Sequence, residues 1–197
     1  MNEQGTITYI LNYLPTPHSY PPEQSTSLCL INGIKDIQNY QSLYLQIGSE
    51  WGWHHQNNWS QTQWSEHLSC PNIQGWILLQ ANIPCGFFEL RYHPDKSVEI
   101  YYFGLVKTLQ GKGLGSRLLA CAVDAAQTMT RHLIWLKTSS TDHPAALRLY
   151  LQGGFKVIRV VQNSLSLSEQ GSGALIPCAR ENSHEKKRIN IAEISPH

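Results

Sequence analysis

The strongest constraint in this sequence is a glycine-rich turn at residues 110–115, QGKGLG, in which three of the six residues are glycine. An apolar run that predicts a strand ends at Val106, and a helical pattern begins at Leu114. Glycine lets the backbone approach a ligand closely, and the first N–H groups of a helix favour an anion. We therefore predict a phosphate-binding turn, with a tight strand-to-helix connection as the alternative.

Two better-known phosphate motifs do not fit this turn. A Walker P-loop needs Gly-Lys-Ser/Thr after a longer loop, and a dinucleotide fingerprint needs its third glycine one position beyond Gly115. The surroundings of the turn therefore have to indicate its ligand.

Hydrophobic periodicity predicts alternating strands and helices along the chain. Short turns at Ala81-Asn82 and at residues 93–96 predict an antiparallel meander, and Ser60 with Gln63 forms the pattern of a helix capping box. Strands are expected near residues 6–11, 27–31, 73–80, 85–91, 98–106, 133–137 and 155–161, and helices near 37–47, from 60 onward, at 114–129 and at 145–152.

A second motif, DHPAALRLY at residues 142–150, is followed by Gly154-Phe155. With the Q-x-x-G-x-G pattern of the turn, in this order, it resembles the GNAT acetyltransferase superfamily over roughly residues 43–161. The resemblance implies an α/β fold with a mixed, mostly antiparallel sheet of about six to seven strands and about four flanking helices. That sheet would be splayed between its fourth and fifth strands. We expect one acyltransferase domain at residues 1–163 and a C-terminal appendage or flexible tail at 164–197.

By the same resemblance, coenzyme A would lie in the split, as acetyl-CoA or another acyl-CoA co-substrate. Backbone groups of one strand segment would hold the pantetheine arm, namely Phe103, Gly104, Leu105 and Val106. The turn would hold the pyrophosphate through Gln110, Gly111, Lys112, Gly113, Leu114 and Gly115, with a solvated Lys112 as an equal alternative. His143 stands where many members carry an Asn that contacts the cofactor.

Two residues match the proton-transfer positions of the superfamily. An amine with a pKa of about 10.4 must lose a proton before it attacks a thioester. Glu99, eleven positions before Gln110, matches a general base; the alternatives are a strand-edge glutamate and proton removal through waters. Tyr150 matches the tyrosine that protonates the departing thiolate, and the alternative is a helix tyrosine that packs under the sheet.

The segment Ser49–His67 corresponds to the acceptor wall of the superfamily and is rich in aromatic residues. Its tryptophans would bind an apolar or cationic acceptor, or form a hydrophobic cap over a small core. Glu89 and Arg91 share one strand face and would orient a carboxylate or an amine, unless they are ordinary exposed residues. The candidate acceptor contacts are Trp51, Trp53, His54, Trp59, Glu89, Arg91 and Tyr101. His54 and His55 have no third spaced ligand, so we predict no metal site.

Charge and cysteine content narrow the class of protein further. Fifteen Lys and Arg residues against fourteen Asp and Glu residues give a net charge of +1, so we expect neither a nucleic-acid nor a membrane partner. Five scattered cysteines without a CxxC pair predict free thiols in a reducing, cytoplasmic compartment. We expect a monomer or homodimer.

Two hypotheses follow for the function. The first is an N-acyltransferase that moves an acetyl or longer acyl group from acyl-CoA to a primary amine of a small molecule, amino acid or peptide. The second is a non-catalytic acyl-CoA-binding or sensing module, in which Glu99 and Tyr150 only pack.

Overall fold

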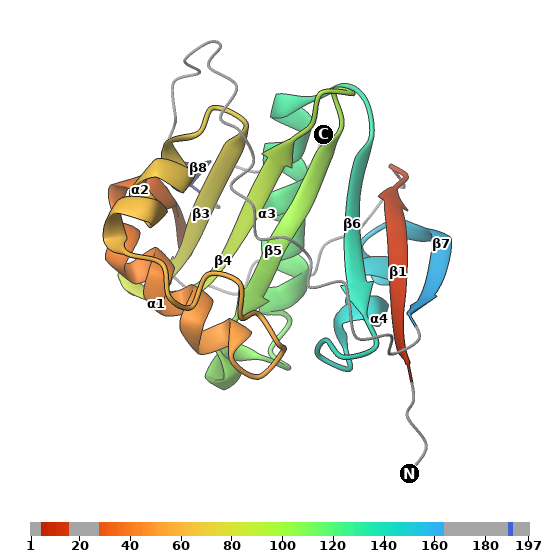
Figure 1. Cartoon of the computed structure of the whole chain (residues 1–197), viewed down its shortest axis with the longest axis horizontal. Helices are drawn as coiled ribbons and strands as arrows, with labels where there is room; N and C mark the ends of the chain where they lie inside the picture. Colours follow the sequence, from red (N-terminus) through yellow and green to blue (C-terminus); the bar gives the residue numbers. More distant parts are fainter. Residues whose placement is uncertain (1–4, 16–27, 164–188, 191–197) are drawn as a thin grey trace.

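The computed structural model describes residues 5–15, 28–163 and 189–190 of the chain. They form one sheet in the order β7-β1-β6-β5-β4-β3-β2-β8, with four α-helices (Figure 1). The strands are β1 Thr6–Tyr13, β2 Leu28–Asn32, β3 Ile73–Gln80, β4 Ile83–Tyr92, β5 Val98–Leu105, β6 Ile134–Ser139, β7 Phe155–Asn163 and the two-residue β8 Ile189–Asn190. The helices are α1 Ile37–Gly48, α2 Gln61–Ser69, α3 Leu114–Met129 and α4 Ala146–Gln152, with short 3-10 turns at Gly33–Lys35 and Lys107–Leu109.

Strands β2 to β5 form the predicted antiparallel meander. The turn between β3 and β4 has positive φ angles at both Ala81 (48°) and Asn82 (66°). Two successive left-handed residues are typical of the two-residue hairpin turn that matches strand twist. The capping box at the start of α2 is also confirmed: the Ser60 side chain accepts from the Gln63 backbone N–H, and the Gln63 side chain accepts from the Ser60 N–H.

The sheet opens between β5 and β6, the fourth and fifth strands counted from β2. These two strands are parallel and pair only from Val98 opposite Ile134 to Ile100 opposite Leu136. Beyond Ile100, β5 keeps its pairing with β4 alone. The predicted fold class, including the split, is confirmed.

Strand β1 occupies a position that local sequence patterns did not reveal. It lies between β6 and β7 and is antiparallel to both, so both of its edges are paired (Figure 1). The expected strand at residues 6–11 is present, but its two partners are more than 120 residues away along the chain. Hydrophobic alternation predicts a strand and does not identify its neighbours.

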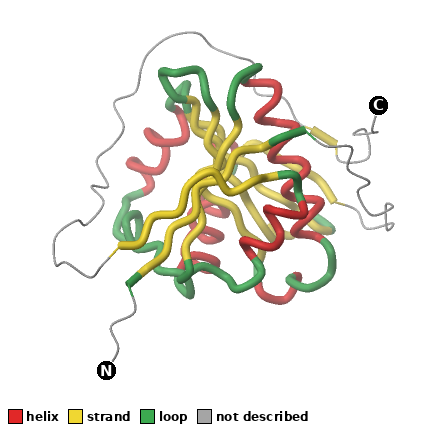
Figure 2. Tube along the Cα trace, turned by 90° about the vertical axis from the view of Figure 1, so that its right-hand side faces the viewer, coloured by secondary structure: helices red, strands yellow, loops and turns green. Residues whose placement is uncertain are grey.

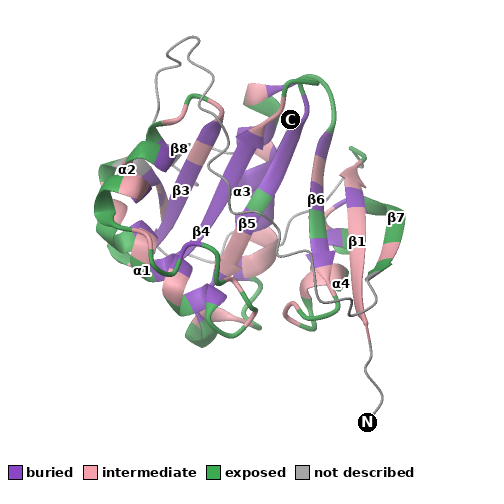
Figure 3. Cartoon of the chain, viewed as in Figure 1, coloured by how far each residue is buried: buried purple, intermediate pink, exposed green. Residues whose placement is uncertain are grey.

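The helices cover both faces of the sheet, which Figure 2 shows from the side. Helix α1 places Tyr40, Leu43, Tyr44 and Ile47 on its buried face, at the three- and four-residue spacing of an amphipathic helix. Helices α1 and α2 lie on one face, and α3 and α4 on the other (Figure 1). The central strands β3 to β5 carry the most buried residues (Figure 3).

Two sequence-based expectations fall largely outside the described residues. The Pro-rich connection at residues 15–22 has only its first residue described, and of the expected appendage at 164–197 only Ile189–Asn190 is described. That pair forms β8 beside Cys29 and Leu30 of β2. The division at residue 163 stays a prediction.

Candidate active site

The glycine-rich turn has the backbone of an anion-binding turn. Gly111 and Gly113 have φ angles of 74° and 76°, and Gly113 is the N-cap residue of α3. L-residues with side chains rarely adopt such angles, so glycine is required here by conformation. A Cβ atom at either position would meet no heavy atom within 4 Å, which leaves room for a ligand before the first N–H groups of α3.

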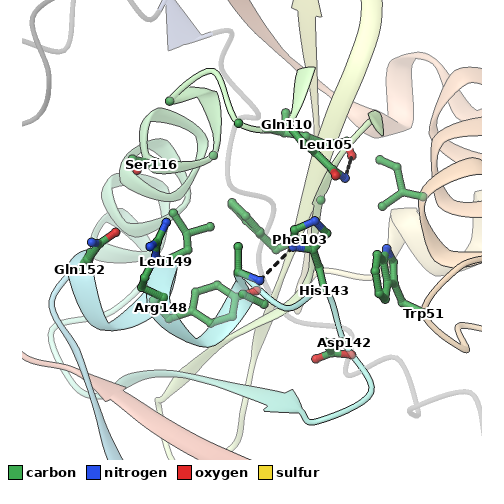
Figure 4. Close-up of a pocket in the computed structure, with 18 of the residues that line it drawn as sticks. Trp51, Phe103, Leu105, Gln110, Ser116, Asp142, His143, Arg148, Leu149 and Gln152 are labelled. Atoms are coloured by element: carbon green, nitrogen blue, oxygen red, sulfur yellow. Dashed lines mark hydrogen bonds between the residues drawn. The ribbon is translucent and has the colours of Figure 1, made fainter. Parts of the chain in front are cut away.

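A cavity of about 310 Å³ lies beside this turn (Figure 4). Its walls come from the end of β5, the start of α3, and the segment from Asp142 through α4. The Gln110 side chain closes one corner, because its Nε2 donates to the Leu105 carbonyl oxygen at 3.2 Å. The lining residues are Ile47, Trp51, Trp53, Phe103, Gly104, Leu105, Gln110, Gly111, Gly113, Gly115, Ser116, Asp142, His143, Ala145, Ala146, Arg148, Leu149, Tyr150 and Gln152.

The cavity contains most of the predicted cofactor residues. Gly104 is tightly packed: a Cβ atom there would lie 2.5 Å from Ile47 Cγ2, so glycine allows α1 to approach β5. The lining does not include Val106, Lys112 or Leu114. Leu114 is buried, and the backbone N–H of Val106 already donates to the Cys85 carbonyl oxygen at 2.9 Å.

His143 is held at the cavity wall by the turn before α4. Its Nδ1 accepts from the Ala145 backbone N–H at 3.0 Å, and its ring lies edge-to-face with Trp51 at 5.2 Å between centroids (Figure 4). Asp142 fixes the same turn, because its Oδ2 accepts from Thr138 Oγ1 and from the Ser139 backbone N–H, both at 2.8 Å. The second motif thus orients a histidine toward the aromatic side of the cavity.

Tyr150 is a buried residue of α4 that lines the cavity. Its ring packs edge-to-face against Phe103 at 5.9 Å and against Phe155 at 6.2 Å. Burial, and secondarily the charge of Asp142, raises the pKa of the Tyr150 phenol above its usual value. The hydroxyl therefore stays protonated at neutral pH.

The aromatic residues of the predicted acceptor wall separate into two groups. Trp51 and Trp53 line the cavity, and Trp53 lies 4.9 Å from the Tyr102 ring. Trp59 packs instead against Trp64 and His67, at 5.2 Å from each ring, as part of the cap over the core.

His54 is exposed and lies outside the cavity lining. Its Nδ1 is 3.4 Å from Asn57 Nδ2.

Glu99 lies on β5 outside the cavity lining and is only 4% exposed. Its Oε2 is 3.0 Å from His93 Nε2, and its Oε1 is 3.6 Å from Lys137 Nζ on β6. Glu99 therefore lies where β5 and β6 are paired, next to the start of the split, with a half-buried imidazole beside its carboxylate.

Glu89 and Arg91 are buried rather than exposed sheet residues. The Glu89 carboxylate accepts from Tyr40 Oη at 3.0 Å, lies 2.8 Å from His67 Nε2, and accepts from Arg91 Nε at 2.8 Å. Burial opposes ionisation of Glu89, but the hydrogen bonds and charges of His67 and Arg91 outweigh it and lower the pKa of the carboxyl group. The Arg91 guanidinium lies over the Tyr101 ring, 3.1 Å from its centroid.

The sequence model described as "Acetyltransferase (GNAT) family" matches residues 35–155, more than half of the chain. The chain belongs to the GNAT acetyltransferase family. No curated protein matches the sequence of this GNAT chain.

Solved GNAT structures share the fold at low sequence identity. The aminoglycoside acetyltransferase meta-AAC0020 from an uncultured soil metagenomic sample is 15% identical with a TM-score of 0.59, over 72% of this chain and 97% of that one. The ribosomal-protein-S18-alanine N-acetyltransferase from Escherichia coli is 17% identical with a TM-score of 0.52, over 66% and 77%. The IAA acetyltransferase from Bacillus cereus is 22% identical with a TM-score of 0.50, over 68% and 79%.

The residues of this GNAT chain fit an acyl-CoA at the cavity. Positive-φ glycines and the start of a 16-residue helix suit a diphosphate, and Arg148 supplies an exposed cation on the same wall. Arg148 lies inside the second motif, so its position in the sequence offered a signal for this role. Tyr40 and His67 offered no such signal, because their contact with Glu89 depends on how α1 and α2 pack on β4.

Neither a group of metal ligands nor a membrane-spanning helix is found in the described part of the chain. No group of three or more His, Cys, Asp or Glu residues there is arranged to hold a metal ion. None of the helices among those residues is long and apolar enough to span a bilayer.

Proposed function

We propose that this GNAT chain is an N-acyltransferase. It moves an acetyl or longer acyl group from acyl-CoA to a primary amine of a small molecule, amino acid or peptide, by direct attack in a ternary complex. The observation that carries the proposal is one cavity that joins the glycine-rich turn, Gly111–Gly115, to the buried phenol of Tyr150. A pyrophosphate at the turn would direct the pantetheine arm along the unpaired edge of β5 toward that phenol.

The ammonium group gives one proton to a base, and the neutral amine nitrogen then attacks the thioester carbonyl carbon. A C–N bond forms and the C–S bond breaks. The departing thiolate takes a proton from Tyr150, which burial keeps in its neutral form, and the second proton released by the nitrogen restores the phenol. Trp51, Trp53 and the end of β5 hold the two reactants together, which contributes through proximity and orientation.

Glu99 is the proposed base that accepts the proton from the amine. It lies where β5 and β6 pair, just before the split begins, and its carboxylate is hydrogen-bonded to His93, which is 29% exposed and offers a route for the proton to solvent. Glu99→Gln keeps the shape of the side chain and removes its basicity. We expect the variant to bind acyl-CoA normally and to need a higher pH for its maximal rate.

Turnover with purified full-length protein tests the proposal. Acetyl-CoA and longer acyl-CoAs are offered with a panel of amines, amino acids and lysine peptides, while thiol release and product mass are followed. The solved relatives are named for very different acceptors, an aminoglycoside and a ribosomal protein, so the panel has to be broad. Acceptor-dependent thiol release with an N-acylated product supports the proposal. Tight acyl-CoA binding without turnover for any acceptor would favour the sensing module instead.

A further inference from the structure

The structure holds a second polar site on the face of the sheet that carries α1 and α2. It centres on Arg91 of β4, which is 7% exposed. Among the described residues, the bond from Nε to Glu89 is the one hydrogen bond that the guanidinium makes. Arginine carries five N–H donors, so the remaining N–H groups are available to a ligand. Glu89 balances the charge of Arg91, and the unused N–H donors can bind a second acceptor such as a carboxylate.

Arg91 is held in place from two sides. Glu89 fixes its Nε edge and is itself fixed by Tyr40 from α1 and His67 from α2. The Tyr101 ring supports the plane of the guanidinium at 3.1 Å. A guanidinium fixed in this way presents its two Nη groups as a rigid fork, the geometry that suits a carboxylate.

A β-bulge brings Tyr101 to this site. The register shifts so that Leu90 pairs with Ile100 and Glu89 pairs with Tyr102, which leaves Tyr101 without a partner on β4. The rings of Tyr101 and Tyr102 lie 4.5 Å apart, so two consecutive side chains share one face. Tyr102 reaches Trp53 of the cavity wall, while Tyr101 supports Arg91. The bulge therefore links the arginine to the cavity.

The surroundings of Arg91 leave its remaining N–H donors unused among the described residues. Glu99 lies directly opposite Arg91 in the β4–β5 pairing, but its carboxylate is bound by His93 and approached by Lys137. On this face α1 packs against β5 at Tyr102 and Gly104, and Figure 1 shows no helix in front of β6. Tyr101 is 36% exposed there. An acceptor can therefore reach the fork from the split.

We propose that Arg91 binds the carboxylate of the acceptor, and that the acceptor is an amino acid whose reacting amine lies at the far end of its side chain. The assignment rests on the proposed acyl transfer and narrows its substrate class. Tyr101 contacts Arg91, and Phe103 contacts Tyr150. These two residues of β5 are two positions apart, about 6.6 Å along a strand, which approximates the distance from the fork to the reacting atoms. An extended ornithine or lysine separates its carboxylate from its side-chain amine by about 6–7.5 Å, whereas an α-amine lies about 2.5 Å away.

Matched acceptors test this inference on the wild-type protein. The value of kcat/KM is measured with acetyl-CoA for lysine, lysinamide and cadaverine, which share the amine and differ in the carboxylate. If the carboxylate of lysine forms a charge-assisted pair with Arg91, kcat/KM for lysine should exceed that for lysinamide and cadaverine by roughly ten- to hundredfold. Equal or better turnover of lysinamide and cadaverine overturns the inference while leaving the acyltransferase proposal intact. A dipeptide that ends in lysine distinguishes a peptide terminus from the free amino acid.

Arg91→Lys tests the residue itself. It keeps a positive charge for Glu89 and loses the two-pronged fork, so the preference for lysine over lysinamide should fall about tenfold, mainly through KM. Arg159→Lys makes the same replacement at an exposed position on β7 and should leave the preference unchanged. An unchanged preference in Arg91→Lys overturns the assignment.

A binding measurement separates the two proposals. Calorimetry with coenzyme A present compares Nε-acetyl-lysine with its amide. Tighter binding of the acid by roughly tenfold or more supports the carboxylate site even if no amine is acetylated, a result that would count only against the acyltransferase proposal. Equal binding of the two overturns the inference.

Discussion

The rings of Phe103 and Tyr150 meet edge-to-face with their centroids 5.9 Å apart. Phe103 belongs to β5, on one side of the split, and Tyr150 belongs to α4, which follows β6 on the other side. Their contact brings the edge of β5 that lacks a β6 partner and a buried phenol to one point of the cavity. The site therefore depends on two segments that the sheet itself keeps apart.

Tyr150→Phe is expected to lower kcat by about a hundredfold, the lower range for loss of a general acid. The substitution keeps the ring that packs on Phe103 and Phe155, so acetyl-CoA affinity and stability should stay close to wild type. Because the pKa of Tyr150 is raised, its ionisation should not limit wild-type activity up to about pH 10. Thiol release and calorimetric affinity are the measurements.

Tyr13→Phe is the matched control for this change. Tyr13 also packs on Phe155, with centroids 5.3 Å apart, but it does not line the cavity. Its kcat should equal that of the wild type. A similar loss in both variants would show that Tyr150 acts through packing and would remove it as the proton donor.

Gly113→Ala should weaken acetyl-CoA binding because it strains the turn. A left-handed conformation costs an L-residue roughly 1–2 kcal/mol, and space around the position is not limiting. Gly52→Ala carries the same strain, with a φ of 74° and open space, outside the cavity lining. Both variants should lose similar stability in denaturant titrations, and only Gly113→Ala should lose affinity for acetyl-CoA. Equal affinities would argue against a phosphate at this turn.

Local features of this fold were predictable and distant contacts were not. The capping box of Ser60 and Gln63 and the hairpin turn at Ala81-Asn82 involve neighbours in sequence, so residue type alone specifies them. The place of β1 between β6 and β7 depends on pairing across the whole chain, which no local period encodes.

The candidate site divides in the same way. The turn at residues 110–115 and the segment at 142–150 can each be recognised from the spacing of their own residues, and both line one cavity in the structure. The Glu89 cluster joins side chains from α1, α2 and β4, and its partners become visible only after these elements have packed. Sequence reasoning found Glu89 and Arg91 through strand alternation and missed Tyr40 and His67.

Gly104→Ala should destabilise the protein by about 1–3 kcal/mol, the usual cost of overpacking. Its Cβ atom would lie 2.5 Å from Ile47 Cγ2, so α1 has to shift away from β5. Ile47→Ala removes the clashing atom, and the double variant should be more stable than the sum of the single changes implies. Gly115→Ala is the steric control, because its nearest contact is Leu149 at 3.4 Å and its φ is not positive. If urea titrations show that the double variant loses as much free energy of unfolding as the two single variants together, the assigned clash is contradicted.

Glu89→Gln should lower the free energy of unfolding by about 3–5 kcal/mol at pH 7, because it leaves the Arg91 charge buried without its anion. The difference in free energy of unfolding between the variant and the wild type should become smaller in acid. The pKa of Glu89 is lowered by His67 and Arg91, so its contribution is complete above the unfolded-state pKa of about 4.3 and fades as pH falls through the lower folded-state value.

Urea titrations of both proteins at pH 7 and at successive values below about pH 4.3 measure this difference. Glu50→Gln is the control: Glu50 pairs with Lys107 at 3.1 Å, but both side chains are exposed, so its loss should stay below about 1 kcal/mol. A Glu89→Gln effect no larger than that of Glu50→Gln would mean that Glu89 does not hold Arg91 as an ion pair. If the difference in free energy of unfolding between the wild type and Glu89→Gln grows in acid, the folded-state pKa of Glu89 is raised. The buried carboxyl group would then hold Arg91 as a neutral acid.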